Sequence, residues 1–181
     1  MNKTISTSVK LSVAGLTTAL STVILIFSSV IAVGTYALPI IAGTLLCVLV
    51  IDFNKALAWS SFVATSLIAI IISSDKEAVL YYICFFGFYP IIKANLENIK
   101  NKIISYVLKF ATFNICMIAL YFIAINLFNI PLESFTIFNL NIPLLFLIFG
   151  NIFFIIYDIA LTRVISLYIS KYRKYVIRKN K

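Results

Sequence analysis

Residues 11–33 read LSVAGLTTAL STVILIFSSV IAV, an apolar run without a charged side chain, and this stretch decides the class of fold. A helix needs about 20 such residues to cross about 30 Å of hydrocarbon. The run is too long for the core of a signal peptide, which has about 7–15 residues, and no clean small-x-small cleavage site closes it. It therefore predicts a membrane-spanning helix that the protein keeps.

The rest of the chain has the same character. Of its 181 residues, 62% are hydrophobic and 12% are charged, and the mean hydropathy is +1.08. Soluble domains carry about 25% charged residues, so this chain has more apolar surface than one soluble core would bury. The composition predicts a single integral membrane domain over residues 1–181.

Six apolar segments follow one another along the chain, at about 11–33, 37–51, 56–73, 78–92, 103–130 and 142–169. They predict an all-α, polytopic membrane bundle of about six transmembrane helices. The second and fourth segments are short, so re-entrant or tilted segments are alternatives to full spans. Pro39 and Pro90 are expected in the first or last turn of these segments, where a proline removes no central hydrogen bond.

The positions of lysine and arginine predict that both chain ends lie in the cytoplasm, because short loops that carry these residues stay inside. In this orientation Lys76 alone falls outside, and Lys109 and Arg163 lie close enough to cytoplasmic helix ends to snorkel. The inside positions are Lys3, Lys10, Lys55, Lys93, Lys100, Lys102 and the six cations of the tail 171–181.

The net charge of +9 arises from these short segments rather than from a polar surface, which favours a membrane partner over nucleic acid. The basic tail 171–181 follows the last apolar segment, where it would attract anionic lipid headgroups. We expect a short amphipathic helix on the cytoplasmic face from Lys93 to Lys102, which would contact lipid weakly or bind a partner.

The residues give no sign of an enzyme. The chain has no histidine, and its six acidic residues are scattered singly. Cys47, Cys84 and Cys116 lie inside apolar runs, where a thiol acts as a small apolar side chain. We expect no catalytic residues, no metal and no cofactor, and any ATP-driven motor would be on another chain.

Small residues recur along the first segment at three- and four-residue spacing: Ser8, Ser12, Gly15, Ala19 and Thr22. Small residues let two helix backbones approach closely, which is how helices associate in lipid. The stripe around Gly15 and Ala19 predicts either packing within this bundle or a docking face for another membrane protein.

Two charged residues, Asp158 and Arg163, lie inside the sixth segment, and we predict that Lys93 is a third intramembrane charge. An ion at that depth is costly unless it is paired. A separation of five residues puts the two about 140° apart around a helix, so we expect Asp158 to pair elsewhere, with Lys93, Lys109 or Asp52. The pair would be a structural fastening or would serve in coupling or proton transfer.

The loops predicted to face outward contain polar and aromatic residues that would together rim a small-molecule pocket. The alternative is ordinary interfacial polarity with an aromatic belt. The candidate binding residues are Tyr36, Asp75, Glu77, Tyr81 and Glu133.

With its length, six-segment pattern, small-residue first helix and polar outer loops, the chain resembles the substrate-binding S components of energy-coupling-factor transporters. The stretches Tyr81 to Lys93 and Gly150 to Arg163 are also similar to an uncharacterised clostridial-type membrane family that we associate with this group. The resemblance implies a multi-pass protein of a bacterial plasma membrane.

What the resemblance further implies is capture of a vitamin or metal ion from outside, with a coupling protein and two ATPases on other chains. In that family a small-residue first helix meets the coupling protein, which Gly15 and Ala19 match. The absence of histidine excludes the histidine-dependent metal-binding type, and no motif assigns a known vitamin, so the resemblance implies a vitamin-like small molecule without naming it. The competing hypothesis is a membrane scaffold similar to small rod-shape-determining proteins.

Overall fold

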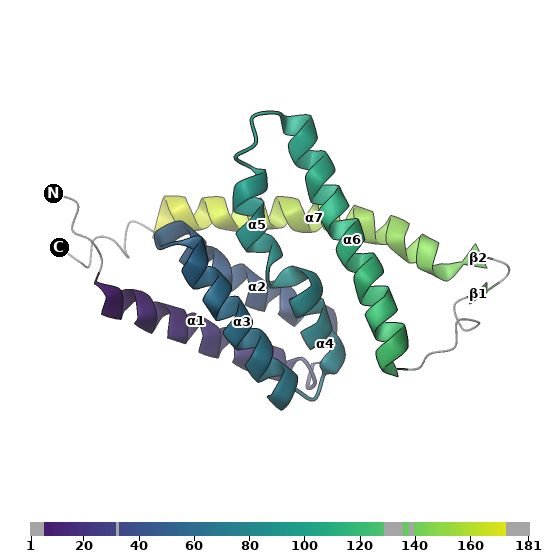
Figure 1. Ribbon diagram of the computed structural model, residues 1–181, viewed down its shortest axis with the longest axis horizontal. Coiled ribbons are helices and arrows are strands. Elements are labelled where there is room, and N and C mark those ends of the chain that lie inside the picture. Colours follow the sequence, from purple (N-terminus) through teal and green to yellow (C-terminus); the bar gives the residue numbers. More distant parts are fainter. Residues whose placement is uncertain (1–5, 32, 129–135, 138–139, 173–181) are drawn as a thin grey trace. The chain divides into compact units, whose positions relative to one another are not determined.

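The apolar segments become helices. The computed structural model describes residues 6–31, 33–128, 136–137 and 140–172 (Figure 1). Within these ranges six helices are long and apolar enough to cross a membrane: Thr7–Phe27, Gly34–Asp52, Lys55–Ile72, Lys76–Leu96, Lys102–Ile123 and Leu147–Lys171. The prediction of six helices of spanning length is confirmed, and it includes the short second and fourth segments.

The chain divides into two compact units, Met1–Ile99 and Lys100–Lys181. The composition predicted a single membrane domain over residues 1–181, and for these two units that stays a prediction. Unit 1 contains α1 (Thr7–Phe27), α2 (Gly34–Asp52), α3 (Lys55–Ile72) and a fourth span made of α4 (Lys76–Tyr81), the π-helical turn η1 (Tyr82–Phe86) and α5 (Tyr89–Leu96). Helix α2 packs against every other span of this unit.

Side-chain caps fix where three of these helices begin. Ser6 accepts a hydrogen bond from the Val9 amide before α1, and Asn54 accepts one from the Leu57 amide before α3. Asp75 does the same before α4. Each cap satisfies an amide at a helix start that has no partner within the helix.

Helix α1 ends at Phe27, before the predicted limit of Val33. The hydroxyl of Ser28 donates to the Leu25 carbonyl at 2.8 Å, and the Ser29 hydroxyl donates to the Ile26 carbonyl at 3.0 Å. Hydroxyls that bond nearby backbone offer it an alternative to the helix ladder. The apolar character of residues 30–33 extended the prediction past this stop.

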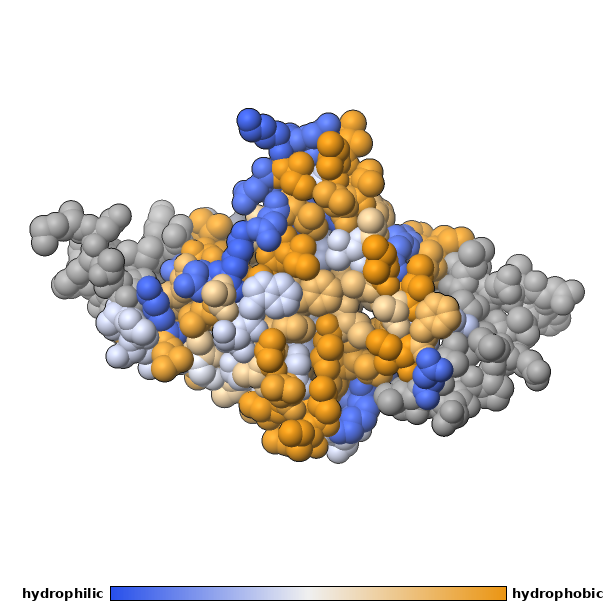
Figure 2. All heavy atoms as spheres, in the orientation of Figure 1, coloured by the Kyte–Doolittle hydropathy of each residue, from blue (hydrophilic) through white to orange (hydrophobic). Residues whose placement is uncertain are grey.

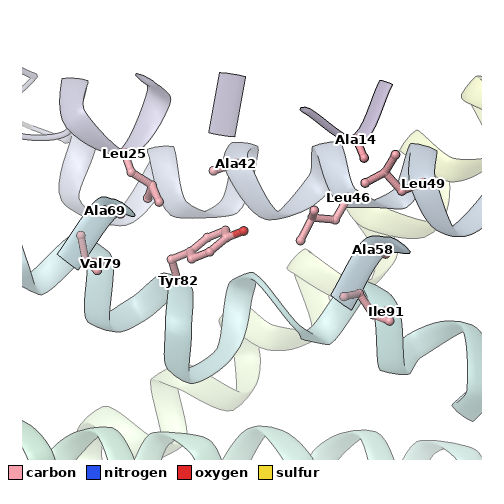
Figure 3. Packing of buried hydrophobic residues seen from close by; sticks show 10 residues of the cluster. All are labelled: Ala14, Leu25, Ala42, Leu46, Leu49, Ala58, Ala69, Val79, Tyr82 and Ile91. Carbon is pink, nitrogen blue, oxygen red and sulfur yellow. The ribbon is translucent and has the colours of Figure 1, made fainter. Parts of the chain in front are cut away.

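The interior of unit 1 lies between α2 and its neighbours. Figure 3 shows the Tyr82 side chain pointing from the fourth span toward α2, near Ala42 and Leu46. Leu25 of α1 and Ala69 of α3 belong to the same buried cluster. Alternation of these large and small side chains lets the helices approach closely.

The fourth span changes from α-helical to π-helical hydrogen bonding at η1. The Gly87 amide donates to the Tyr82 carbonyl at 2.7 Å, five residues back. A Cβ atom at Gly43 of α2 would overlap the Phe86 carbonyl oxygen, so the α2 backbone lies directly against this turn. Pro90 follows at the start of α5, six residues before the span ends at Leu96, so its predicted place in a last turn is wrong. The turn accommodates a proline whose missing N–H would interrupt a regular helix.

Two further expectations for unit 1 are corrected. Because α2 begins at Gly34, Pro39 lies in the second turn of the helix and not in its first. The separate amphipathic helix from Lys93 to Lys102 is absent from the described residues: α5 continues to Leu96, and α6 begins at Lys102. Lys93 and Leu96 are buried against the rest of unit 1, so this segment completes the fourth span.

Unit 2 is a pair of packed helices, α6 (Lys102–Phe128) and α7 (Ile142–Leu167), and α7 continues into the π-helical turn η3 (Tyr168–Tyr172). Two short antiparallel strands, β1 (Thr136–Ile137) and β2 (Leu140–Asn141), lie between the helices. The Phe113 and Phe154 rings stack at a centroid distance of 4.8 Å, which fixes α6 against α7.

Large apolar side chains cover most of the visible surface in Figure 2, and hydrophilic residues gather at connections, plainly at the one between α5 and α6 at the top. Exposed residues on α3 include Leu67 and Ile71, and those on α6 include Ile103 and Ile115. Such extensive exposed apolar surface suits a lipid environment. Six helices of spanning length with this surface indicate a membrane protein.

Candidate functional site

Four of the five candidate binding residues meet at one end of unit 1. The Thr35 hydroxyl at the start of α2 donates to Asp75 Oδ2 at 2.8 Å. The Tyr81 hydroxyl donates to Glu77 Oε1 at 3.0 Å. The Tyr36 and Tyr81 rings lie 5.3 Å apart between centroids, tilted by 46°. We call Thr35, Tyr36, Asp75, Glu77 and Tyr81 the α2–α4 end cluster.

Local structure explains why these side chains converge. Asp75 caps α4, since its Oδ1 accepts from the Ala78 amide at 3.0 Å, and its other oxygen is held by Thr35. Glu77 and Tyr81 lie one helical turn apart on α4, so they share a face. The contacts between α2 and α4 bring Tyr36 to the same place.

The α2–α4 end cluster combines two carboxylates with two phenol rings. Tyr36 is 55% exposed and Glu77 is exposed, whereas Asp75 and Tyr81 are half-buried. Tyrosine offers a flat apolar wall with a polar edge, and carboxylates accept hydrogen bonds from donor groups. The arrangement suits a small molecule with an apolar ring and donor groups. Glu133, the fifth candidate, lies outside the described residues.

The small-residue stripe of α1 divides between two faces of that helix. Thr22 faces the interior of unit 1, together with Ala14, Thr17 and Ser21, and Ser21 donates to the Ala42 carbonyl of α2. The other members of the stripe, Ser8, Ser12, Gly15 and Ala19, are exposed. A Cβ atom at Gly15 would meet no heavy atom within 4 Å. The rest of unit 1 therefore leaves this face of the α1 backbone uncovered.

Asp158 is paired with Lys109, one of its three expected partners. The Lys109 Nζ atom lies 2.9 Å from Asp158 Oδ2, and both side chains are nearly buried between α6 and α7. The expectation that Lys109 snorkels to the interface is wrong, because its ammonium group is turned to this carboxylate. Arg163 is exposed on α7.

Sequence reasoning missed a second polar contact in unit 2. Asn114 and Asn151 exchange two side-chain hydrogen bonds of 3.0 Å between α6 and α7. Two amides inside apolar runs were the available signal, since a lone amide in lipid is costly. We call Lys109, Asn114, Asn151 and Asp158 the α6–α7 polar ladder.

Lys93, predicted as a third intramembrane charge, is fully buried near the opposite end of unit 1 from the α2–α4 end cluster. Its Nζ atom forms a salt bridge of 2.8 Å with Glu97, one turn further along the chain. Lys55 donates a hydrogen bond to Asn95, which ties the start of α3 to α5. These contacts fasten the helix ends at which lysines were predicted to gather.

Across the residues that the structure describes, no three Cys, Asp or Glu side chains are grouped to hold a metal ion. Comparisons with known protein families, with characterised proteins and with solved structures found no match to this chain. The class that the fold defines is thus an all-helical protein with six helices of membrane-spanning length.

Proposed function

We propose that this chain is the membrane-embedded, substrate-binding component of an ATP-driven uptake transporter for a small, vitamin-like molecule. In this proposal the coupling membrane protein and the ATPase pair are separate chains. The protein lies in a bacterial plasma membrane, with both termini in the cytoplasm and the α2–α4 end cluster outside.

The observation that carries the proposal is the exposure of Gly15 and Ala19 on α1. Within unit 1, neither α2 nor α3 covers these residues, so this face of α1 is open to a helix from outside the unit. Open space around the Gly15 Cα atom lets a partner helix approach the backbone closely, and close packing is a main source of helix association in lipid.

The α2–α4 end cluster supports the binding part of the proposal. It gathers groups from two spans that are distant in sequence, and a tyrosine pair stands beside two carboxylates. A ligand there would stack on Tyr36 and donate hydrogen bonds to Glu77 and Asp75.

Purification from the native membrane tests the docking step. We expect a tagged wild-type chain to recover a coupling membrane protein and its ATPases, and the Gly15→Leu/Ala19→Leu variant to lose them. The matched control is Ala56→Leu/Ser60→Leu, which places the same bulk on two exposed residues four positions apart on α3. Equal recovery by both variants would remove the support for docking through α1. Recovery of cell-wall elongation proteins instead would replace the proposal by the scaffold hypothesis.

Native mass spectrometry of the gently extracted protein tests the binding step. We expect a retained small molecule that Tyr36→Ala and Glu77→Gln each reduce. Tyr106→Ala is the matched control, since Tyr106 is 57% exposed on α6, away from the cluster residues in sequence. A molecule retained equally by all three variants would place binding elsewhere.

A further inference from the structure

Both helices of unit 2 carry polar side chains that are costly in lipid. Helix α6 carries Lys109 and Asn114 well inside its length, and α7 carries Asn151 and Asp158. An ion or an unpaired amide within a spanning helix opposes its insertion. For each helix alone, its apolar residues must offset the unfavourable free energy of inserting these polar groups.

When the two helices pack together, each of these groups contacts a partner on the other helix. Lys109 meets Asp158 at 2.9 Å, and Asn114 meets Asn151 through two bonds of 3.0 Å. Between the two rungs, the Phe113 and Phe154 rings stack. The rungs follow the antiparallel order of the two helices, so a shift of one helix along the other would break both at once.

Hydrophobicity gives no drive for helices to associate once both are in lipid, so packing and hydrogen bonds must supply it. We propose that α6 and α7 enter the membrane as one preformed hairpin, in which the α6–α7 polar ladder pairs its two charged side chains and its two amides before insertion. This inference does not depend on the proposed transport function. The ladder thereby lowers the cost of inserting the two helices and also sets their register.

The proposal predicts that damage to one helix keeps both out of the membrane. The full chain, with its three cysteines changed to alanine, would be synthesised in a cell-free system containing membrane vesicles. Single cysteine probes, Ser134→Cys between the helices and Lys181→Cys at the end, would be labelled with an impermeant thiol reagent before and after permeabilisation. In the otherwise unchanged chain, we expect the two probes on opposite sides of the membrane.

In the Asp158→Lys variant, two ammonium groups face each other, and we expect the probe at 134 to move to the side of the probe at 181, with the latter unchanged. The charge-swapped variant Lys109→Asp/Asp158→Lys should restore opposite sides. Three results would overturn the proposal: a normal pattern in Asp158→Lys, movement of the probe at 181 to the side of 134, or failure of the swap to restore the pattern. The second would mean that α6 inserts without α7.

Discussion

The ammonium group of Lys109 and the carboxylate of Asp158 lie 2.9 Å apart on two different helices, with 6% and 11% of their side chains exposed. They are separated by 49 positions in sequence. A buried ion pair of this kind gives weak net stabilisation, but removal of one partner leaves an uncompensated charge. This asymmetry makes the contact testable.

Asp158→Leu should destabilise unit 2 by about 3–5 kcal/mol, because Lys109 then lacks its counter-charge. The double variant Lys109→Leu/Asp158→Leu should be close to wild type in stability or above it, since both charges are gone. Unfolding of the full chain in detergent, followed by the signal of a probe in α7, measures both. A single variant as stable as the double would contradict the ion pair.

Loss of the hydrogen bonds between Asn114 and Asn151 should lower the stability by a smaller amount, which can be measured separately. Asn114→Leu or Asn151→Leu should each cost about 0.5–2 kcal/mol, and the double variant should cost less than the sum of the two. The same unfolding measurement applies. Thr112→Val is the matched control, because that hydroxyl bonds the Leu108 carbonyl of its own helix, and additive losses at Asn114 and Asn151 would rule out coupling.

The helices were predictable from sequence because a membrane-spanning helix requires a long apolar run. Such a run is a local feature of the sequence and does not depend on distant contacts. The π-helical turn at Tyr82–Phe86 was not, since no local pattern marked it and its close contact with Gly43 comes from another span. The burial of Lys93 was missed for the same reason: a lysine near a helix end reads as interfacial unless its surroundings are known.

For the candidate sites, sequence supplied residue types and not contacts. Loop placement predicted that Tyr36 and Tyr81 lie at one end, and the structure brings their rings together. The three partners considered for Asp158 were equivalent until the pairing of α6 with α7 selected Lys109. Asn114 was overlooked because a single amide in an apolar run does not identify its partner, which here is on α7.

Asp75 has two structural roles, as the cap of α4 and as the acceptor for the Thr35 hydroxyl, and removal of its side chain ends both. Asp75→Ala removes the cap of α4 and the acceptor of the Thr35 hydroxyl, so we expect a loss of about 1–3 kcal/mol in local stability. Asp75→Asn keeps an acceptor for the cap and should retain most of it. Hydrogen exchange of the amides in α4 measures the effect, and equal protection in Asp75→Ala and wild type would contradict the capping role.

Two glycines in neighbouring helices should respond oppositely to one added methyl group. Gly43→Ala places a Cβ atom onto the Phe86 carbonyl, which is backbone and cannot rotate away, so α2 and the fourth span must separate. We expect a loss of about 1–3 kcal/mol, the range for overpacking in a tight interior. Gly15→Ala meets open space and should leave stability unchanged or raise it by up to about 1 kcal/mol through better helix propensity. Thermal unfolding of both variants in one detergent compares them directly. If Gly43→Ala is tolerated as well as Gly15→Ala, α2 does not pack tightly against the π-helical turn.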